Sequence, residues 1–562
     1  MRRGVSGAVM KTRALALLAL LAVLSLLVGC TGDDANSPPL DVEVEPSPEN
    51  ALRAEVRFNA AVDSQLTVEV VGPEGSGFRF TDPSSGGGDR SVPLVGLKPD
   101  TEYTVEVVSD DQAESATFTT GSLPDDMPPI EVEAQPDDME PGLTLFDVIP
   151  LRFGKGDGEP TDDGYLIAVD SDGDVVWYHR QAHSIQDARQ TEDGDILFIH
   201  HETGVKRLDV MADALTEWSG TTGLEHAPED SHGRPYAGAN AIKVETDQMH
   251  HEVIELPNGN LMTLSRVLEE IDGYAEPICE EDDEFTGSYQ VAADTVVEFD
   301  PADGTVVNEW SLFDFVDPLG DVDRIRASEF CGQYLEEVYP ERDARDWTHA
   351  NAVVLDEERN AILVSARHID QILAIRYQAD DEGPAGELLW RLGEGGDFTL
   401  TEGEWFLHQH APEVLDDGSI MVYDNGNERP GTSLDEPDNL PYSRAVQYEI
   451  DTENWTATQV WEHRADAPGE AVYAPFVGDA DVLDGGTVLI THGGLLDPPA
   501  HTPQTEGVQT WGRVIEVDYD TGDVVFDLKV KDPAGEANWI VYRAERIPSM
   551  YPQGHAVEQI GG

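Results

Sequence analysis

The chain has 562 residues, and its 112 Asp and Glu residues far outnumber its 34 Lys and Arg residues, which gives a formal net charge of −78. This length predicts several domains, and a hydrophobic content of 40% supplies enough apolar material for folded cores, which argues against a disordered acidic chain. Such a negative chain repels phosphate backbones, and no basic patch occurs in the sequence, so the composition argues against nucleic-acid binding.

Residues 1–29 have the pattern of a lipoprotein signal peptide. Basic residues precede an apolar run from Ala14 to Val28, and the run ends at Leu27-Val-Gly-Cys30, which resembles a bacterial lipobox. We therefore expect Cys30 to be lipidated and to anchor the protein in the bacterial cell envelope, periplasm-facing or exposed. Thr31 after the cysteine favours the outer membrane. Residues 30–48 are predicted to form a polar, proline-rich tether, and an uncleaved N-terminal anchor is the alternative.

Residues 49–122 predict a small β-sandwich of the immunoglobulin or fibronectin III type. Short alternating segments at 54–58, 66–70, 104–107 and 116–119 are separated by turn clusters, which is typical of an antiparallel sandwich. The segment from Leu97 to Tyr103 resembles the fibronectin III pattern in which the tyrosine holds a corner. No catalytic cluster occurs here, so we interpret the domain as a spacer or docking module.

Residues 140–550 contain a repeat that predicts a six-bladed β-propeller, so the expected fold class is all-β. Each unit has a turn and then closes on an aromatic residue; the closing residues are Trp177, Trp218, Trp310, Trp390, Trp461 and Phe526. The turns lie at 163–164, 193–194, 258–259, 417–418 and 484–486, with an irregular one at 357–360. Trp177 and Trp218 are 41 residues apart, which matches one four-stranded blade. A final strand at 539–543 is expected to join the first blade and close the ring; an open solenoid is the alternative.

Three histidines occupy one position of this repeat. Counting back eight residues from the turn leads to His251, His349 and His410, and in the other three units to Gly156, Gln186 and Gly478. The position is expected to begin the innermost strand, which places the three histidines near one end of a central channel. A purely structural histidine should recur in nearly every unit, whereas this one recurs in three of six.

Other polar residues lie close to these histidines in the sequence. Asn351 follows His349 by two residues and is expected on the same strand face. Arg367 falls on the next predicted strand and would bring a guanidinium to the same pocket. His250 and His408 flank the set, and either would be the functional residue if the register is off by one or two.

Four separated motifs resemble the bacterial arylsulfate sulfotransferase family: Met249-His-His-Glu-Val-Ile-Glu-Leu-Pro-Asn-Gly-Asn260, Asp346-Trp-Thr-His-Ala-Asn351, Ser365-Ala-Arg367 and Leu407-His-Gln-His-Ala411. The resemblance implies a secreted six-bladed propeller behind a small β-domain. It also implies transfer of a sulfuryl group from a phenolic sulfate ester to a phenol, independent of the nucleotide donor PAPS. His410 would be the histidine that becomes sulfated. His251, His349, Asn351 and Arg367 would hold the sulfuryl oxygens and handle protons.

These residue types suit a two-step sulfuryl exchange. A neutral imidazole can attack sulfur and later leave, because the N–S adduct carries a cationic ring. Arg367 as a permanent cation, Asn351 as a neutral donor and His251 or His349 as imidazolium would stabilise the developing charge. This chemistry requires no metal and no cofactor. The expected partners are an aryl sulfate donor, a phenolic acceptor and, through the lipid, a membrane; homodimer formation is left open.

Two alternatives belong to other functional classes. Three convergent histidines can bind zinc or copper, which would make the chain a metal-binding propeller enzyme, although a nearby arginine suits an anion better. A non-catalytic propeller lipoprotein that binds glycans or proteins would explain the acidic surface but not the histidine register. Cys279 and Cys331 are expected to pair as a disulfide in an oxidising compartment, away from the catalytic residues.

Overall fold

The computed structural model describes residues 39–60, 66–82, 87–109, 112–151, 163–226, 233–276, 285–320, 344–436, 438–464, 472–551 and 557–560. Cys30, Cys279 and Cys331 lie outside these ranges, so lipidation and the disulfide stay predictions. Across the described ranges, no helix has both the length and the apolar character that a membrane-crossing segment needs.

The N-terminal strands form a sandwich of two sheets, as predicted. One sheet has the order β1 (Glu43–Pro46), β2 (Ala54–Ala60), β5 (Gly88–Leu94); the other has the order β37 (Glu558–Ile560), β4 (Gly77–Asp82), β3 (Leu66–Val71), β6 (Glu102–Val108), β7 (Ala113–Thr119). Alternate residues of β3 are buried, as expected for a strand with one face in a core. The Tyr103 hydroxyl accepts a hydrogen bond from the Lys98 N–H (2.9 Å), which is the corner that the fibronectin-like pattern predicts. The strand β37 was not predicted from the sequence; it comes from the far end of the chain and pairs with β4.

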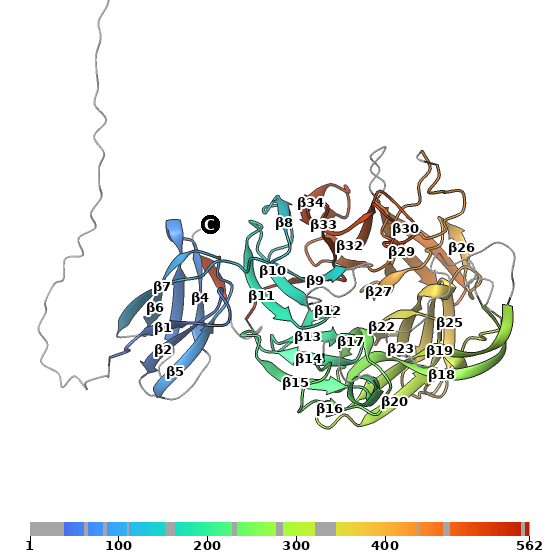
Figure 1. Ribbon diagram of the computed structural model, residues 1–562, viewed down its shortest axis with the longest axis horizontal. Coiled ribbons are helices and arrows are strands. Elements are labelled where there is room, and N and C mark those ends of the chain that lie inside the picture. The colour runs from blue at the N-terminus through green and yellow to red at the C-terminus, as the bar shows by residue number, and fades with distance from the viewer. Residues whose placement is uncertain are drawn as a thin grey trace, which may run out of the picture. The chain divides into compact units, whose positions relative to one another are not determined.

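Six further sheets are formed by the described residues that follow the sandwich, and Figure 1 shows them around a common centre. The first three contain β36 (Ala544–Ile547), β9 (Leu143–Leu151), β10 (Gly164–Val169), β11 (Val175–Gln181); β12 (Ile185–Gln190), β13 (Ile196–His200), β14 (Gly204–Leu208), β15 (Ala214–Ser219); and β17 (His250–Glu255), β18 (Leu261–Glu276), β19 (Phe285–Phe299), β20 (Val306–Ser311). The other three contain β22 (Ala350–Asp356), β23 (Ala361–Ala366), β24 (Gln371–Arg376), β25 (Leu388–Gly393); β27 (His410–Val414), β28 (Ile420–Asp424), β29 (Arg444–Asp451), β30 (Thr456–His463); and β31 (Asp479–Val482), β32 (Thr487–Asp497), β33 (Gln509–Asp518), β34 (Val524–Val530). The predicted all-β fold, a sandwich followed by a propeller, is confirmed, and we interpret each of these sheets as one blade.

The closing aromatic residues have the same place in all six sheets, because each lies on the fourth strand: Trp177, Trp218, Trp310, Trp390, Trp461 and Phe526. The position predicted for the turn within the first repeat, between its first and second strands, is wrong. Its first strand is β36 from the end of the chain, so the turn at 163–164 lies between the second and third strands. Gly156, placed in the histidine register by that prediction, lies outside the described residues.

Both ends of the repeat region close the ring. The strand predicted at 539–543 corresponds in part to β35 (Asn538–Ile540), which pairs with β9, and the innermost strand β36, which also pairs with β9, begins only after the predicted residues. The strand β8 (Ile130–Ala134) pairs with β34 on the outer side of the last sheet. Pairing at both places satisfies backbone groups that an open sheet edge would leave exposed.

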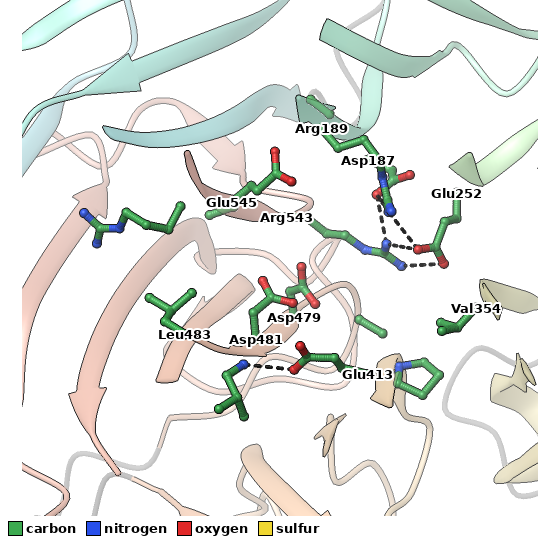
Figure 2. Close-up of a pocket in the computed structure, with 16 residues that line it drawn as sticks. Asp187, Arg189, Glu252, Val354, Glu413, Asp479, Asp481, Leu483, Arg543 and Glu545 are labelled. Atoms are coloured by element: carbon green, nitrogen blue, oxygen red, sulfur yellow. Dashed lines mark hydrogen bonds and ion pairs between the residues drawn. The ribbon is translucent and has the colours of Figure 1, made fainter. Parts of the chain in front are cut away.

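A cavity of about 340 Å³ is lined by residues from the first strands of all six sheets (Figure 2). Carboxylates dominate its lining: Asp187, Glu252, Glu413, Asp479, Asp481 and Glu545. Arg543 binds Asp187 and Glu252, and Figure 2 shows the carboxylates of Asp479 and Asp481 on the opposite side, without such a partner among the residues drawn. Burial raises the pKa of Glu545 to about 7 and raises the pKa of Asp479 well above its ordinary value.

We expect Glu545→Gln to stabilise the protein at alkaline pH. The folded state holds a proton on Glu545 up to about pH 7, whereas the unfolded state releases it near the ordinary value of 4.5, so stability falls as pH rises through this window. Glutamine does not ionise and can still accept the hydrogen bond from the Gln190 N–H. The gain in the free energy of unfolding should grow to about 3 kcal/mol at pH 8. Urea unfolding at pH 5 and pH 8 measures it, with exposed Glu506→Gln as control; an equal gain at both pH values would contradict the prediction.

Candidate active site

The three histidines of the repeat register lie at corresponding places in three consecutive sheets. His251 is the second residue of β17, His349 directly precedes β22, and His410 begins β27. A β-bulge interrupts the pairing of each of these strands with its neighbour at this point. His251 and His349 have positive φ angles of 63° and 46°, which few non-glycine residues adopt. Bulges re-aim side chains, so the simple alternation assumed from the sequence does not apply here.

The structure brings these histidines together. The rings of His251 and His349 meet edge to face with centroids 5.1 Å apart. His368 stacks on His349 at 4.7 Å, and the charges of His349 and Arg367 both act on His410. His251, His368 and His410 are buried, and burial, more than any neighbouring charge, lowers the pKa of each well below its ordinary value. At neutral pH these three rings are therefore uncharged.

His410 is held by an asparagine in a defined orientation. Its Nδ1 lies 2.6 Å from Asn425 Oδ1, and Asn425 Nδ2 donates to the carbonyls of Ala474 (2.8 Å) and Val477 (2.9 Å). Because the amide nitrogen is committed to these carbonyls, Oδ1 faces the ring as an acceptor and His410 Nδ1 carries the proton. Nε2 then keeps its lone pair, and no described residue forms a hydrogen bond with it.

His251 is held by its neighbour in the chain. The Nδ1 atoms of His250 and His251 lie 2.7 Å apart, so one of them must donate. His250 Nε2 lies 3.3 Å from the buried Asp294 Oδ1 without a hydrogen bond, and the nearby carboxylate favours the His250 proton on Nε2. His251 therefore donates through Nδ1 and also leaves a lone pair on Nε2.

His349 is held by a carboxylate. Its Nδ1 lies 2.5 Å from Oδ2 of Asp346, three residues earlier in the chain. Burial by itself would raise the pKa of Asp346, but the charge and the hydrogen bond of His349 lower it below its usual range. The Asp346 side chain is 2% exposed, whereas that of His349 is 20% exposed.

Asn351 and Arg367 lie among the same elements, and the Arg367 N–H donates to the His349 carbonyl (3.3 Å). Asn351 Nδ2 donates to the Gln409 carbonyl (2.8 Å), next to His410. Arg367 was expected on a strand, but it lies in the short 3-10 helix η4 (Arg367–Ile369) that follows β23. Its Nη2 donates to the Pro475 carbonyl (2.8 Å). Both side chains are buried.

The two flanking histidines differ in position. His250 lies behind His251, as described above, whereas His408 Nδ1 lies 3.1 Å from Asp370 Oδ1 and its ring is 6.4 Å from that of His368. Glu252 directly follows His251 in the chain, but its carboxylate forms no ion pair with that ring in the described part of the chain. Its carboxylate instead binds Arg189 and Arg543 and accepts from the Val353 N–H.

Sequence reasoning missed three residues of the site. Asp346 begins one quoted motif and His368 directly follows another, and the three-residue spacing of Asp346 from His349 was an available signal. Asn425 follows β28 in Asp424-Asn-Gly-Asn427, which reads as an ordinary turn. Only the three-dimensional pairing of β27 with β28 reveals its role.

One group in the site has the donor set of a metal centre. Asp346, His349 and His368 place ligand atoms within 4.8 Å of one another, whereas His251, His349 and His410, the expected trio, do not form such a group among the described residues. A second group, Asp170, Asp172 and Asp174, surrounds the Lys98 ammonium at 2.7–2.9 Å, and this cation occupies the place that a metal would take.

Comparisons with known families agree with these motifs. The family described as Arylsulfotransferase (ASST) matches residues 130–543, and the Arylsulfotransferase Ig-like domain matches residues 41–123. The chain belongs to the arylsulfotransferase family. The match includes strands of all six sheets and every histidine of the site.

Two curated members of the arylsulfotransferase family resemble the chain over part of its length. The arylsulfate sulfotransferases AssT of Lelliottia amnigena and of Escherichia coli O6:H1 are each 27% identical over 290 residues, which is 45% of this chain and 46% of each relative. The chain thus matches less than half the length of these relatives. A solved structure, the periplasmic gluconolactonase of Pseudomonas aeruginosa, is 11% identical with a TM-score of 0.31 over 71% of this chain and 100% of that one. Likeness at this level carries no argument about function.

Asn425→Asp should raise the pKa of His410. A carboxylate at this place favours the imidazolium more strongly than the native amide does, whose hydrogen bond raises the pKa of His410 less than burial lowers it. An NMR pH titration of the His410 ring, identified by its loss in His410→Gln, measures the change. Asn454→Asp adds the same charge at an exposed turn and should leave His410 unaltered; an unchanged His410 pKa in Asn425→Asp would refute the orientation described here.

Proposed function

We propose that the chain is an arylsulfate sulfotransferase that moves a sulfuryl group from a phenolic sulfate ester to a phenol through a sulfated His410, without PAPS. The observation that carries the proposal is the hydrogen bond from His410 Nδ1 to Asn425, which leaves a lone pair on Nε2 of a buried, uncharged ring. A nucleophile needs this lone pair, and a charged imidazole lacks it. Membership of the arylsulfotransferase family supports the same reaction class.

In the first step, His410 Nε2 attacks the sulfur of the aryl sulfate. An N–S bond forms, the bond between sulfur and the phenolic oxygen breaks, and the phenolate leaves with the bonding electrons. The sulfated ring becomes cationic while Nδ1 keeps its proton, so its hydrogen bond to Asn425 strengthens. A histidine of the cluster donates a proton to the departing phenolate.

In the second step, a phenol loses its proton to the same histidine and its oxygen attacks sulfur. The S–O bond forms, the N–S bond breaks, and the electron pair returns to His410 Nε2. Arg367 contributes a permanent positive charge that acts on His410 and suits the sulfonate oxygens in both steps. Asn351, fixed by the Gln409 carbonyl beside His410, is a further polar group that we assign to these oxygens, and His251 can donate to them once its Nε2 has taken up a proton. We place His250 and His408 in supporting positions behind this first set.

We expect the enzyme, given 4-nitrophenyl sulfate and no acceptor, to release one equivalent of 4-nitrophenol in a burst and to carry one sulfuryl group on His410. Peptide mass spectrometry under mildly alkaline conditions locates the group, because the N–S bond is labile in acid. His410→Ala should abolish the burst, whereas exposed His501→Ala should keep it. Full burst activity in His410→Ala, or a stable adduct on another histidine, would refute the assignment.

The cellular setting follows from the N-terminal pattern. We propose that Cys30 is lipidated and holds the enzyme at the envelope, in the outer membrane, and that Cys279 and Cys331 form a disulfide. Cys30→Ala should then move the protein from membrane fractions to the soluble fraction. Continued membrane binding of this variant would argue for an uncleaved N-terminal anchor.

A metal-dependent enzyme is the second candidate function. The observation that favours it is the gathering of ligand atoms from Asp346, His349 and His368 within 4.8 Å. Arg367 directly precedes His368, and a guanidinium next to a dication is unfavourable. Metal analysis of the purified protein distinguishes the two candidates: a stoichiometric transition metal, with activity lost on chelation and regained on its return, would favour the second.

A further inference from the structure

We infer that Asp346 is the positioning residue that makes His349 the proton donor and acceptor of the sulfuryl transfer. The inference rests on the proposed function and deepens it. It assigns to one ring the proton transfers that the sequence left open between His251 and His349.

The Asp346 carboxylate forms its side-chain hydrogen bond with His349. It lies in the short strand β21 (Arg345–Asp346), which pairs with β19, and its side chain is almost fully buried. Its Oδ2 accepts from His349 Nδ1 at 2.5 Å, while its buried Oδ1 has no hydrogen-bond partner in the described part of the chain. A buried carboxylate with one strong donor stabilises positive charge on that donor.

His349 is the register histidine whose Nδ1 contacts a buried carboxylate, and its other close neighbours are histidine rings. His251 and His368 face it directly at 5.1 and 4.7 Å, and His250 and His410 lie close enough to sense its charge. Burial keeps these four rings neutral, since it lowers the pKa of each. Of the charged residues, Arg266 acts on Asp346 as a cation, and Asp294 senses the charge of Asp346.

The three register histidines therefore differ in what holds Nδ1. A neutral amide holds His410, a neutral imidazole holds His251, and a carboxylate holds His349. Of these three acceptors, the carboxylate most strongly stabilises the imidazolium that forms when Nε2 carries a proton, because it alone carries a negative charge. With Nδ1–H bound to Asp346, His349 Nε2 gives its proton to the leaving phenolate in the first step and takes one from the acceptor phenol in the second. Nδ1 and Asp346 keep their bonding throughout.

The test is the effect of Asp346→Asn on a series of aryl sulfates with increasingly basic leaving groups. A strongly basic phenolate needs the proton, whereas 4-nitrophenolate leaves without it. We expect kcat/KM for phenyl sulfate to fall by about 100-fold or more and that for 4-nitrophenyl sulfate by less than about tenfold. A purely structural effect would lower both equally, and equal losses would overturn the inference.

Two further variants keep the test decisive. Asp356→Asn removes another buried carboxylate, at the far end of β22, and should leave the leaving-group dependence as in the wild type. In a His349→Gln background, Asp346→Asn should cause less than about twofold further loss, because Asp346 acts through His349. A full additional loss there would overturn the inference even if Asp346→Asn alone is poorly folded.

Failure of this inference can be told apart from failure of the proposed function. If Asp346→Asn still gives a burst of 4-nitrophenol and a sulfated His410, the nucleophilic half of the reaction is intact and only the proton transfer is under test. If the wild-type protein forms no adduct on His410, the proposed function itself is wrong. A metal that is bound by the wild type and lost from Asp346→Asn would assign Asp346 to a metal centre instead and overturn the inference.

Discussion

A buried guanidinium near the end of the chain ties the sheets to one another around the central cavity. Arg543 donates to Asp187 (2.9 Å) on β12, to Glu252 (2.7 Å) on β17 and to the Asn351 carbonyl (3.2 Å) on β22, as Figure 2 shows for the two carboxylates. Its own N–H donates to the buried Asp147 on β9. Removing one partner of such a buried ion pair typically costs about 3–5 kcal/mol. The side chain of Arg543 therefore links three first strands and adds to the ring closure that the pairing of β36 with β9 provides.

The hydrogen bonds of Arg543 also hold residues next to the active-site histidines. Glu252 follows His251 in the chain, and Asn351 follows His349 by two residues, so Arg543 fixes the backbone from which both histidines project. The β-bulges at the starts of these strands then turn the rings toward one another. The group that accepts the hydrogen bond from Nδ1 determines whether each ring acts as a nucleophile or transfers a proton. Chemically identical side chains in equivalent positions thereby take up different tasks.

The sequence predicts the elements of this molecule better than its contacts. Closing aromatics at the fourth strands and hairpin turns at regular spacing revealed the sheets, and a period shared by His251, His349 and His410 revealed the site. The phase of the first sheet could not be read, because its first strand comes from the far end of the chain. Side-chain direction failed where bulges break the alternation on which it was based. Asn425 and Arg543 stayed hidden, because their partners are distant in sequence and no local pattern marks a tautomer or a buried ion pair.

The most direct test of this account is the protonation state of the three register histidines. Nitrogen-15 NMR of histidine-labelled protein near pH 7, with each ring assigned from its glutamine variant, distinguishes Nδ1–H, Nε2–H and doubly protonated rings. The account predicts neutral Nδ1–H rings with an unprotonated Nε2 for His410 and His251. For His349 it predicts Nδ1 protonated toward Asp346, with Nε2 exchanging its proton most readily of the three. A His410 that carries its proton on Nε2, or that is doubly protonated at this pH, would contradict the account.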